Sequence, residues 1–292
     1  DDINPVLGCY GDTLAITPEM DALAASGVTF LNAHCQWSVC GPSRASLMTG
    51  LMPEETGVQG FKKMRGDADN GSRVNPVKRP NVVTIPQYFR YNGYRTAAVG
   101  KINDYRCVGS MDVSTAKVAE DGAAVDDPPS WGEPVDPNAL PTNFFTSSSY
   151  VQAAGGWSPA GKPSVASNDA PDSVFTDGII CDEGITLLQN LATNDTRFFL
   201  GVGFKKPHLA FVAPQDYWDL YNRDDFEIHP FQDHPENEVP HTWNYAKELA
   251  TYDEFYDPIG DPGGTGIPCT DIPAAKQKEL LHGYYACVSF ID

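Results

Sequence analysis

Residues 38–50 read SVCGPSRASLMTG and predict a short helix that begins at a cysteine. Pro42 suits the first helical turn, because its φ is already helical and its missing N–H would have no partner there. Gly50 is a typical residue for the end of a helix. Cys40 then lies at the N-terminus, where unpaired N–H groups and the helix dipole favour an anion. Arg44 follows on the same face, so the stretch predicts an anion site.

Several chemistries are compatible with a cysteine and an arginine at this place. A thiolate nucleophile is one. Cysteine-dependent phosphatases, however, separate the two residues by a longer loop that wraps the phosphate, whereas only three residues lie between Cys40 and Arg44. A papain-like protease needs a different surround, which is missing. A buried structural cysteine is the remaining alternative, since cysteine is among the residues most often buried.

Helix and strand patterns alternate on both sides of this stretch. The helices are predicted over 17–27, 86–92, 182–192 and from 274 onward, and the strands over 28–31, 95–99 and 197–204, the last as a buried strand. Such alternation predicts an α/β fold with a largely parallel sheet. Ligands of such sheets bind beyond the carboxyl ends of the strands, where Lys101 and the KKPH run at 205–208 follow two of the predicted strands.

Two long stretches, 105–170 and 213–273, are rich in proline, glycine, serine, acidic or aromatic residues. This composition indicates that both stretches are loop-rich insertions. Long loops within a domain are usually functional or disordered.

The composition excludes several classes of function. The 292 residues are 41% hydrophobic, enough for one large domain or two small ones. The formal net charge of −19 argues against nucleic acid and anionic membranes as partners. An anionic substrate would therefore need a local positive pocket. No apolar run is long enough for a membrane span.

Cysteines and glycosylation sequons favour a secretory route. With Cys40 set aside for chemistry, six of the seven cysteines could form up to three disulfides. Sequons begin at Asn70 and Asn194.

The pattern C-x-P-S-R followed by L-M-T-G, from Cys40 to Gly50, resembles the signature of the type I, formylglycine-dependent sulfatases. Further blocks occur in the order found in that family: DDINPVLGCYGD at 1–12, IPQYFRYNGYRTAAVGK at 85–101, FFLGVGFKKPH at 198–208 and YYACVSFID at 284–292. The chain is identified as a member of this family, most similar to its iduronate-2-sulfatase-like members.

The resemblance implies an alkaline-phosphatase-like, three-layer α/β/α sandwich with a largely parallel central sheet. Residues 1–292 would form the N-terminal part of a single catalytic domain, with 105–170 and 213–273 as substrate-side insertions. Because the family's first strand and its later Asp-His-Gly block are missing, we expect an incomplete sandwich, an internal fragment that binds calcium weakly and does not turn over by itself.

The resemblance also implies a nucleophile made by modification. A formylglycine-generating enzyme in the secretory pathway would oxidise Cys40 to an aldehyde. One hydroxyl of the hydrated aldehyde attacks sulfur and the second expels sulfate, while Arg44 holds the diol. Asp1, Asp2 and the modified Cys40 would bind Ca²⁺, or less readily Mg²⁺, since hard oxygen ligands suit both ions.

The remaining site residues follow from the same resemblance. Lys101 and His208 would contact the sulfate, His208 protonating the leaving oxygen, and Lys206 is a weaker substrate-binding candidate. Relatives carry a histidine that deprotonates the second hydroxyl at the position of Asp104, with Asn103 as the weaker alternative, and an aspartate can also take that proton. The other histidines match no site motif and are predicted to be structural or to lie in loops: His34, His229, His234, His241 and His282.

We therefore predict a secreted or lysosomal glycoprotein that hydrolyses a sulfate ester of a carbohydrate. The replacement by Asp104 leaves open an impaired, sulfatase-like protein that binds sulfated glycans. A metallo-phosphodiesterase of the wider superfamily is a third alternative, although those enzymes carry Thr or Ser in place of Cys40.

Overall fold

The computed structural model describes residues 1–60, 64, 82–104, 107, 127, 130–134, 150–151, 157–193, 195–232, 236–237, 248–255 and 272–292. Contacts between Cα atoms divide the chain into two compact units. Unit 1 comprises Asp1–Leu31, Trp157–Phe175 and Lys206–Asp292, and unit 2 comprises Asn32–Gly156 and Thr176–Lys205. Each unit is described by itself.

Unit 2 is built on a parallel sheet, which confirms the predicted α/β class. Its strand order is β2 (Tyr150–Val151), β1 (Arg95–Gly100) and β4 (Phe198–Gly203). β1 and β4 pair in register from Arg95 opposite Phe198 to Gly100 opposite Gly203. Parallel pairing brings the carboxyl ends of both strands to one edge of the sheet.

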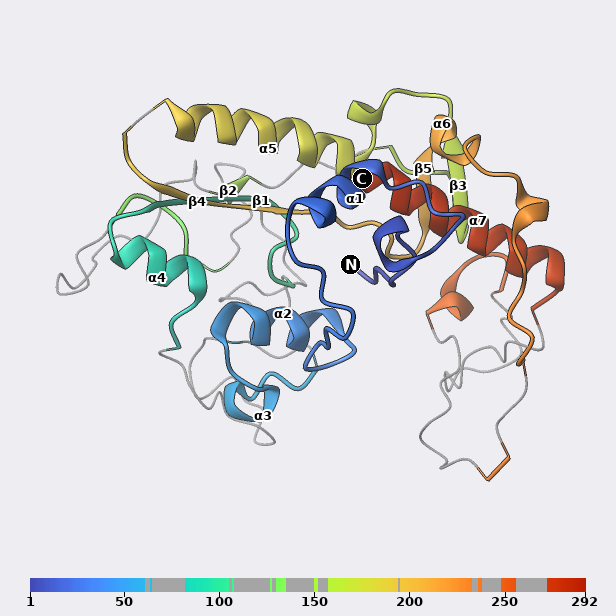
Figure 1. Cartoon of the computed structure of the whole chain (residues 1–292), viewed down its shortest axis with the longest axis horizontal. Helices are drawn as coiled ribbons and strands as arrows, with labels where there is room; N and C mark the ends of the chain where they lie inside the picture. The colour runs from blue at the N-terminus through green and yellow to red at the C-terminus, as the bar shows by residue number, and fades with distance from the viewer. Residues whose placement is uncertain are drawn as a thin grey trace. The chain divides into compact units, whose positions relative to one another are not determined.

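Helices cover both faces of this sheet (Figure 1). Consecutive strand residues point to opposite faces. Ala98 of β1 therefore packs with Trp131 and Met48, the latter from α2 (Cys40–Thr49), while Val99 packs against Ile180 of α5 (Thr176–Ala192). α4 (Ile85–Tyr91) also contacts β1 and β4. This arrangement is the predicted three-layer order within unit 2.

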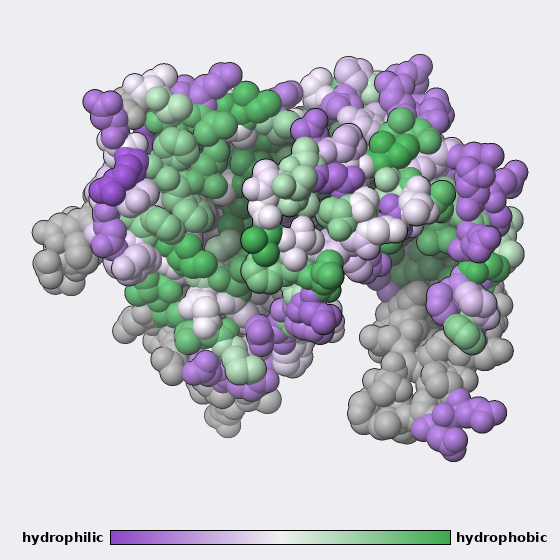
Figure 2. Space-filling view, in the orientation of Figure 1, coloured by the Kyte–Doolittle hydropathy of each residue, from purple (hydrophilic) through white to green (hydrophobic). Residues whose placement is uncertain are grey.

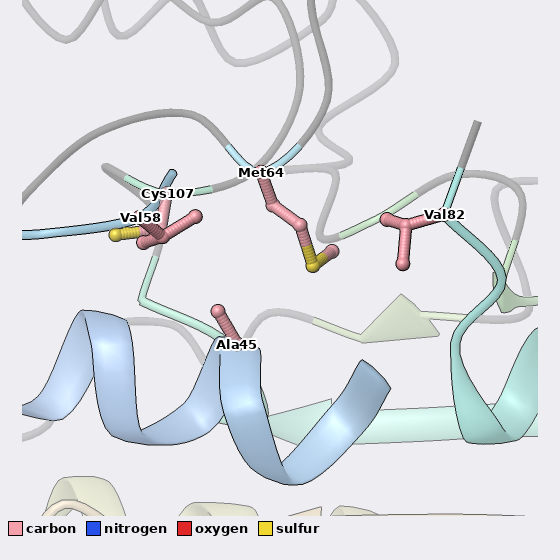
Figure 3. Packing of buried hydrophobic residues seen from close by; sticks show 5 residues of the cluster. All are labelled: Ala45, Val58, Met64, Val82 and Cys107. Atoms are coloured by element: carbon pink, nitrogen blue, oxygen red, sulfur yellow. The ribbon is translucent and has the colours of Figure 1, made fainter. Parts of the chain in front are cut away.

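A second cluster fixes the outer side of α2. Ala45 packs with Val58, Met64, Val82 and Cys107, all nearly inaccessible to solvent (Figure 3). α3 (Pro53–Thr56) lies between Ala45 and Val58 in sequence. Ala45 packs α2 against this cluster, and Met48 packs it against the sheet. These contacts fix the position of the first residue of α2, Cys40, relative to the sheet.

Unit 1 contains a second, smaller parallel pair, β3 (Val165–Asn168) and β5 (Phe211–Pro214). The long α7 (Ala274–Ile291) packs on it, and Ala286 and Cys287 of this helix share a core with side chains of the β5 and α6 segment. Further elements are α1 (Pro18–Ser26), α6 (Gln215–Trp218) and the 3-10 turns η1 (Gly8–Tyr10), η4 (Asp172–Val174), η5 (Arg223–Asp225) and η6 (Leu249–Thr251).

The structure confirms the predicted helices at 17–27, 40–50, 86–92 and from 274 onward, and the strand at 95–99. The predicted helix over 182–192 begins earlier, at Thr176. The predicted strand over 28–31 is wrong: these residues pair with no strand in the described chain, and Val28 is 80% exposed. Its apolar sequence resembles a strand, but a strand needs a partner for its backbone.

The structure adds short elements to the two loop-rich stretches: 105–170 contains β2 and β3, and 213–273 contains the end of β5 and α6. Two other expectations are corrected. β4 is half-buried rather than buried, and hydrophobic side chains gather at the surface over α5 and β4 (Figure 2), where Ile185, Leu188 and Val202 are exposed. The six cysteines among the described residues form no disulfide with one another.

Asn70 and Asn194, which begin the two sequons, lie outside the described residues. None of the helices in the described ranges has the length and apolar character needed to cross a membrane.

We expect Gly100→Ala to destabilise unit 2 by about 2–5 kcal/mol. Gly100 has a φ of +76°, and a Cβ there would collide with the carbonyl oxygen of Gly203 and with Ile180. Gly93→Ala is the matched control, because its φ of +82° is similar while no atom lies within 4 Å of the added Cβ; only the backbone cost of about 1–2 kcal/mol remains. Equal losses in urea unfolding would contradict the steric argument.

Candidate functional site

Cys40 begins α2, as the sequence predicts. Val39 precedes the helix in an extended conformation. Its side chain makes no capping hydrogen bond and therefore satisfies none of the N–H groups of the first turn. Gly50 ends the helix with a φ of +69°, and its N–H donates to the carbonyl of Ser46. The predicted helix is therefore present, with Cys40 as its first residue and Gly50 at its end.

A buried carboxylate faces the cysteine. Asp104 is fully inaccessible to solvent, and its Oδ2 accepts a hydrogen bond from the Cys40 Sγ at 3.1 Å. The same oxygen lies 3.6 Å from the Nζ of Lys101. Asp104 thus stands between a thiol and an ammonium group, with its own carbonyl accepting from the Cys107 N–H.

Arg44 holds the chain that carries Lys101. Its Nη1 donates to the carbonyl oxygens of Lys101 at 2.6 Å and Ile102 at 2.9 Å. The Lys101 N–H donates to the carbonyl of Gly203 at 2.7 Å, which continues the pairing of β1 with β4. Four predicted site residues are thus gathered within unit 2: Cys40, Arg44, Lys101 and Asp104.

Another group of predicted site residues lies within unit 1. The Nε2 of His208 is 3.7 Å from the Asp2 Oδ2, and its Nδ1 lies 2.6 Å from the Leu209 carbonyl oxygen. The two ring nitrogens therefore face different groups: Nδ1 faces the Leu209 carbonyl and Nε2 faces the Asp2 carboxylate. Glu248, which sequence reasoning missed, lies 3.7 Å from Nδ1; it sits in a loop-rich stretch without a motif that could have identified it.

Lys206 has a local role in the same loop. Its Nζ donates to the carbonyl oxygens of His208 at 3.0 Å and Ala210 at 2.6 Å. An ammonium group has three donors, so these two bonds leave one for an anionic ligand. Lys206 therefore stabilises the loop that carries His208.

Asp1 and Asp2 suit a hard cation by donor type. Carboxylate oxygens are preferred ligands of Ca²⁺, which takes 6–8 oxygens. The Asp2 side chain is 58% exposed and open to a ligand. Among the described residues there is no group of three or more candidate metal ligands, and two carboxylates alone would supply fewer oxygens than Ca²⁺ takes.

The other histidines are accounted for differently. His282 is buried in α7 with its Nε2 on the Trp218 carbonyl at 2.8 Å, a structural position. His34 and His229 are exposed or in loops, while His234 and His241 lie outside the described residues.

Comparison with known proteins gives consistent matches along the whole chain. The family model described as Sulfatase matches residues 2–292. Iduronate 2-sulfatase of Homo sapiens is 30% identical over 298 residues, covering 100% of this chain and 48% of that protein. A protein described as a sulfatase from Formosa agariphila is 28% identical over 304 residues, covering 100% of this chain and 52% of that protein. The chain thus spans about half the length of the curated relatives it matches.

Solved structures agree at the level of fold. The phosphonate monoester hydrolase of Agrobacterium radiobacter matches with a TM-score of 0.56 at 16% identity, covering 98% of this chain and 54% of that chain. Identity this low shows the fold alone, and it confirms the predicted alkaline-phosphatase-like α/β class.

We expect Arg44→Gln to lower the free energy of unfolding by about 2–3 kcal/mol, because two carbonyl groups lose charge-assisted hydrogen bonds. Arg95→Gln is the control, since its ion pair with Glu133 joins side chains that are 33% and 62% exposed and exposed pairs contribute about 0.2–1 kcal/mol. Urea unfolding of both variants measures the difference. A loss at Arg44 no larger than that at Arg95 would show that the two carbonyl contacts are not structural.

Proposed function

Because the chain belongs to the sulfatase family, we propose that it provides the nucleophile half of an enzyme that hydrolyses a sulfate ester of a carbohydrate. The observation that carries the proposal is the contact of Cys40, at the N-terminus of α2, with the buried carboxylate of Asp104 at 3.1 Å. Family membership and this contact together favour turnover over a protein that only binds sulfated glycans.

The nucleophile in this proposal is formylglycine made from Cys40. Its hydrate supplies two hydroxyls on one carbon, one to attack sulfur and one to expel sulfate. In the unmodified chain the Cys40 Sγ stands where one of these oxygens would be. Asp104 is within hydrogen-bond distance of that position and can accept the proton that the second step releases.

Lys101 and Arg44 have separate tasks in this scheme. Lys101 supplies positive charge for the sulfate, which a protein of net charge −19 must attract locally. Its side chain is 17% exposed and is held beside Asp104. Arg44 anchors the carbonyls of Lys101 and Ile102 and so maintains the spacing between the ammonium and the start of α2.

Residues of unit 1 are assigned the metal and the leaving group. Asp1 and Asp2 would hold Ca²⁺, which polarises the sulfate when bound. His208 would protonate the leaving oxygen, with its ring oriented by the Leu209 carbonyl. Lys206 maintains the loop and can offer its third donor to the substrate.

The name of a relative supports the proposed substrate class. The similar human protein is named for iduronate, a sugar acid, which supports a sulfated carbohydrate as substrate. Maturation by a formylglycine-generating enzyme implies passage through the secretory pathway, with a lysosomal or extracellular destination.

The first test concerns the nucleophile. We expect the Cys40 peptide, from protein expressed from its complete gene in a eukaryotic secretory host, to carry an aldehyde instead of the thiol by mass spectrometry. Cys40→Ser is the control, because an alcohol yields no aldehyde in that maturation. An unmodified thiol in an active preparation would refute the proposal.

The second test concerns Asp104. We expect Asp104→Asn to lower steady-state hydrolysis of an aryl sulfate by about 10²–10⁴-fold, the usual contribution of a general base. Since the base acts after the alcohol has left, a burst of alcohol release should precede the slow phase. Asp104→His should restore turnover. Full activity of Asp104→Asn would exclude a base at this position, and an inactive wild type with intact aldehyde would favour the glycan-binding alternative.

A further inference from the structure

The hydroxyl of Tyr284, on α7, bridges the short turn that carries Asp2. It donates to the Asp2 carbonyl oxygen at 2.7 Å and accepts from the backbone N–H of Asn4, also at 2.7 Å. A single side chain, 280 positions away from Asn4, thus satisfies one backbone group on each side of the turn.

Contacts with residues elsewhere in the chain are needed to stabilise the backbone conformation of this turn. Asp2 has a φ of 57°, in the left-handed region that non-glycine residues rarely adopt. Asp2, Ile3 and Asn4 are all exposed, so burial contributes little to fixing their conformation. The two hydrogen bonds to Tyr284 therefore weigh heavily in keeping the Asp2 backbone in place.

The ring of Tyr284 is itself fixed against the segment that carries His208. It packs edge-on against Phe211, with ring centroids 5.6 Å apart and an interplanar angle of 89°. Phe211 begins β5, shortly after His208. The hydroxyl thus holds the Asp2 turn while the ring contacts the end of the His208 loop, and the Asp2 Oδ2 and His208 Nε2 lie 3.7 Å apart.

We propose that Tyr284 is a positioning residue that presets the Asp1–Asp2 turn for a divalent cation and aligns it with His208. The inference rests on the proposed function, which assigns the two aspartates to Ca²⁺. Tyr284 contacts neither substrate nor metal in this scheme, and acts through the backbone of Asp2 and Asn4.

The experiment compares Tyr284→Phe with Tyr285→Phe in the protein expressed from its complete gene. Tyr285 is the matched control, because it neighbours Tyr284 on α7 and its hydroxyl also bonds a distant residue, Asp12, at 2.6 Å. Calorimetric titration with Ca²⁺ should show about 10- to 100-fold weaker binding in Tyr284→Phe, the usual effect of removing an outer-shell partner, and unchanged binding in Tyr285→Phe. Excess Ca²⁺ should restore the activity of Tyr284→Phe.

Hydrogen exchange without Ca²⁺ provides an independent readout. The Asn4 amide should exchange faster in Tyr284→Phe than in the wild type or in Tyr285→Phe. Equal Ca²⁺ affinity in the wild type and Tyr284→Phe would overturn this inference and leave the proposed function intact. A wild type that binds no Ca²⁺ would overturn the metal role of Asp1 and Asp2, and with it the role of Tyr284.

Discussion

The close approach of β1 and β4 at Gly100 and Gly203 is the constraint on which the position of Cys40 depends. A side chain at Gly203 would occupy the space of the Lys101 backbone, and one at Gly100 would collide with the Gly203 carbonyl. Because both positions are glycine, the chain can turn sharply after β1 and present the carbonyls of Lys101 and Ile102. Arg44 donates hydrogen bonds to both carbonyls. These bonds fix α2, and therefore Cys40, relative to the end of β1.

Asp104 changes the electrostatics of this region relative to a histidine. A buried carboxylate next to Lys101 is stabilised by the ammonium, and it in turn lowers the positive potential that the ammonium offers to an anion. In a chain of net charge −19, attraction of an anion to the proposed site would then rely more on the N–H groups at the start of α2. The aspartate therefore weakens the attraction of an anion and places a strong hydrogen-bond acceptor beside Cys40.

Local patterns were sufficient to predict much of this fold. Proline and glycine punctuate α1, α2 and α4, and these signals act within a few residues of the helix ends. The strand expected at 28–31 and the missed β3 failed for one reason: whether an extended segment forms a strand depends on a partner elsewhere. β3 forms because Val165–Asn168 pairs with Phe211–Pro214. The sequence of β3, which contains serine and asparagine, does not predict this pairing.

The candidate site also has a part that the sequence predicts and a part that depends on tertiary packing. Spacing and strand-end position predicted that Cys40, Arg44 and Lys101 would lie together, and the family resemblance added Asp104; within unit 2 the four residues do lie together. The supporting contacts could not be predicted. Glu248 and Tyr284 reach His208 and Asp2 across long separations, and only the tertiary packing brings them there.

The bond between Tyr284 and Asp2 also has a consequence for biosynthesis. The Asp2 turn is made on the ribosome 282 residues before its partner, Tyr284. Contacts of such high sequence separation form only after the intervening chain has been synthesised and has closed its loop. The acidic turn therefore remains unformed while the Cys40 segment emerges, and the proposed cation site takes its shape only when α7 docks.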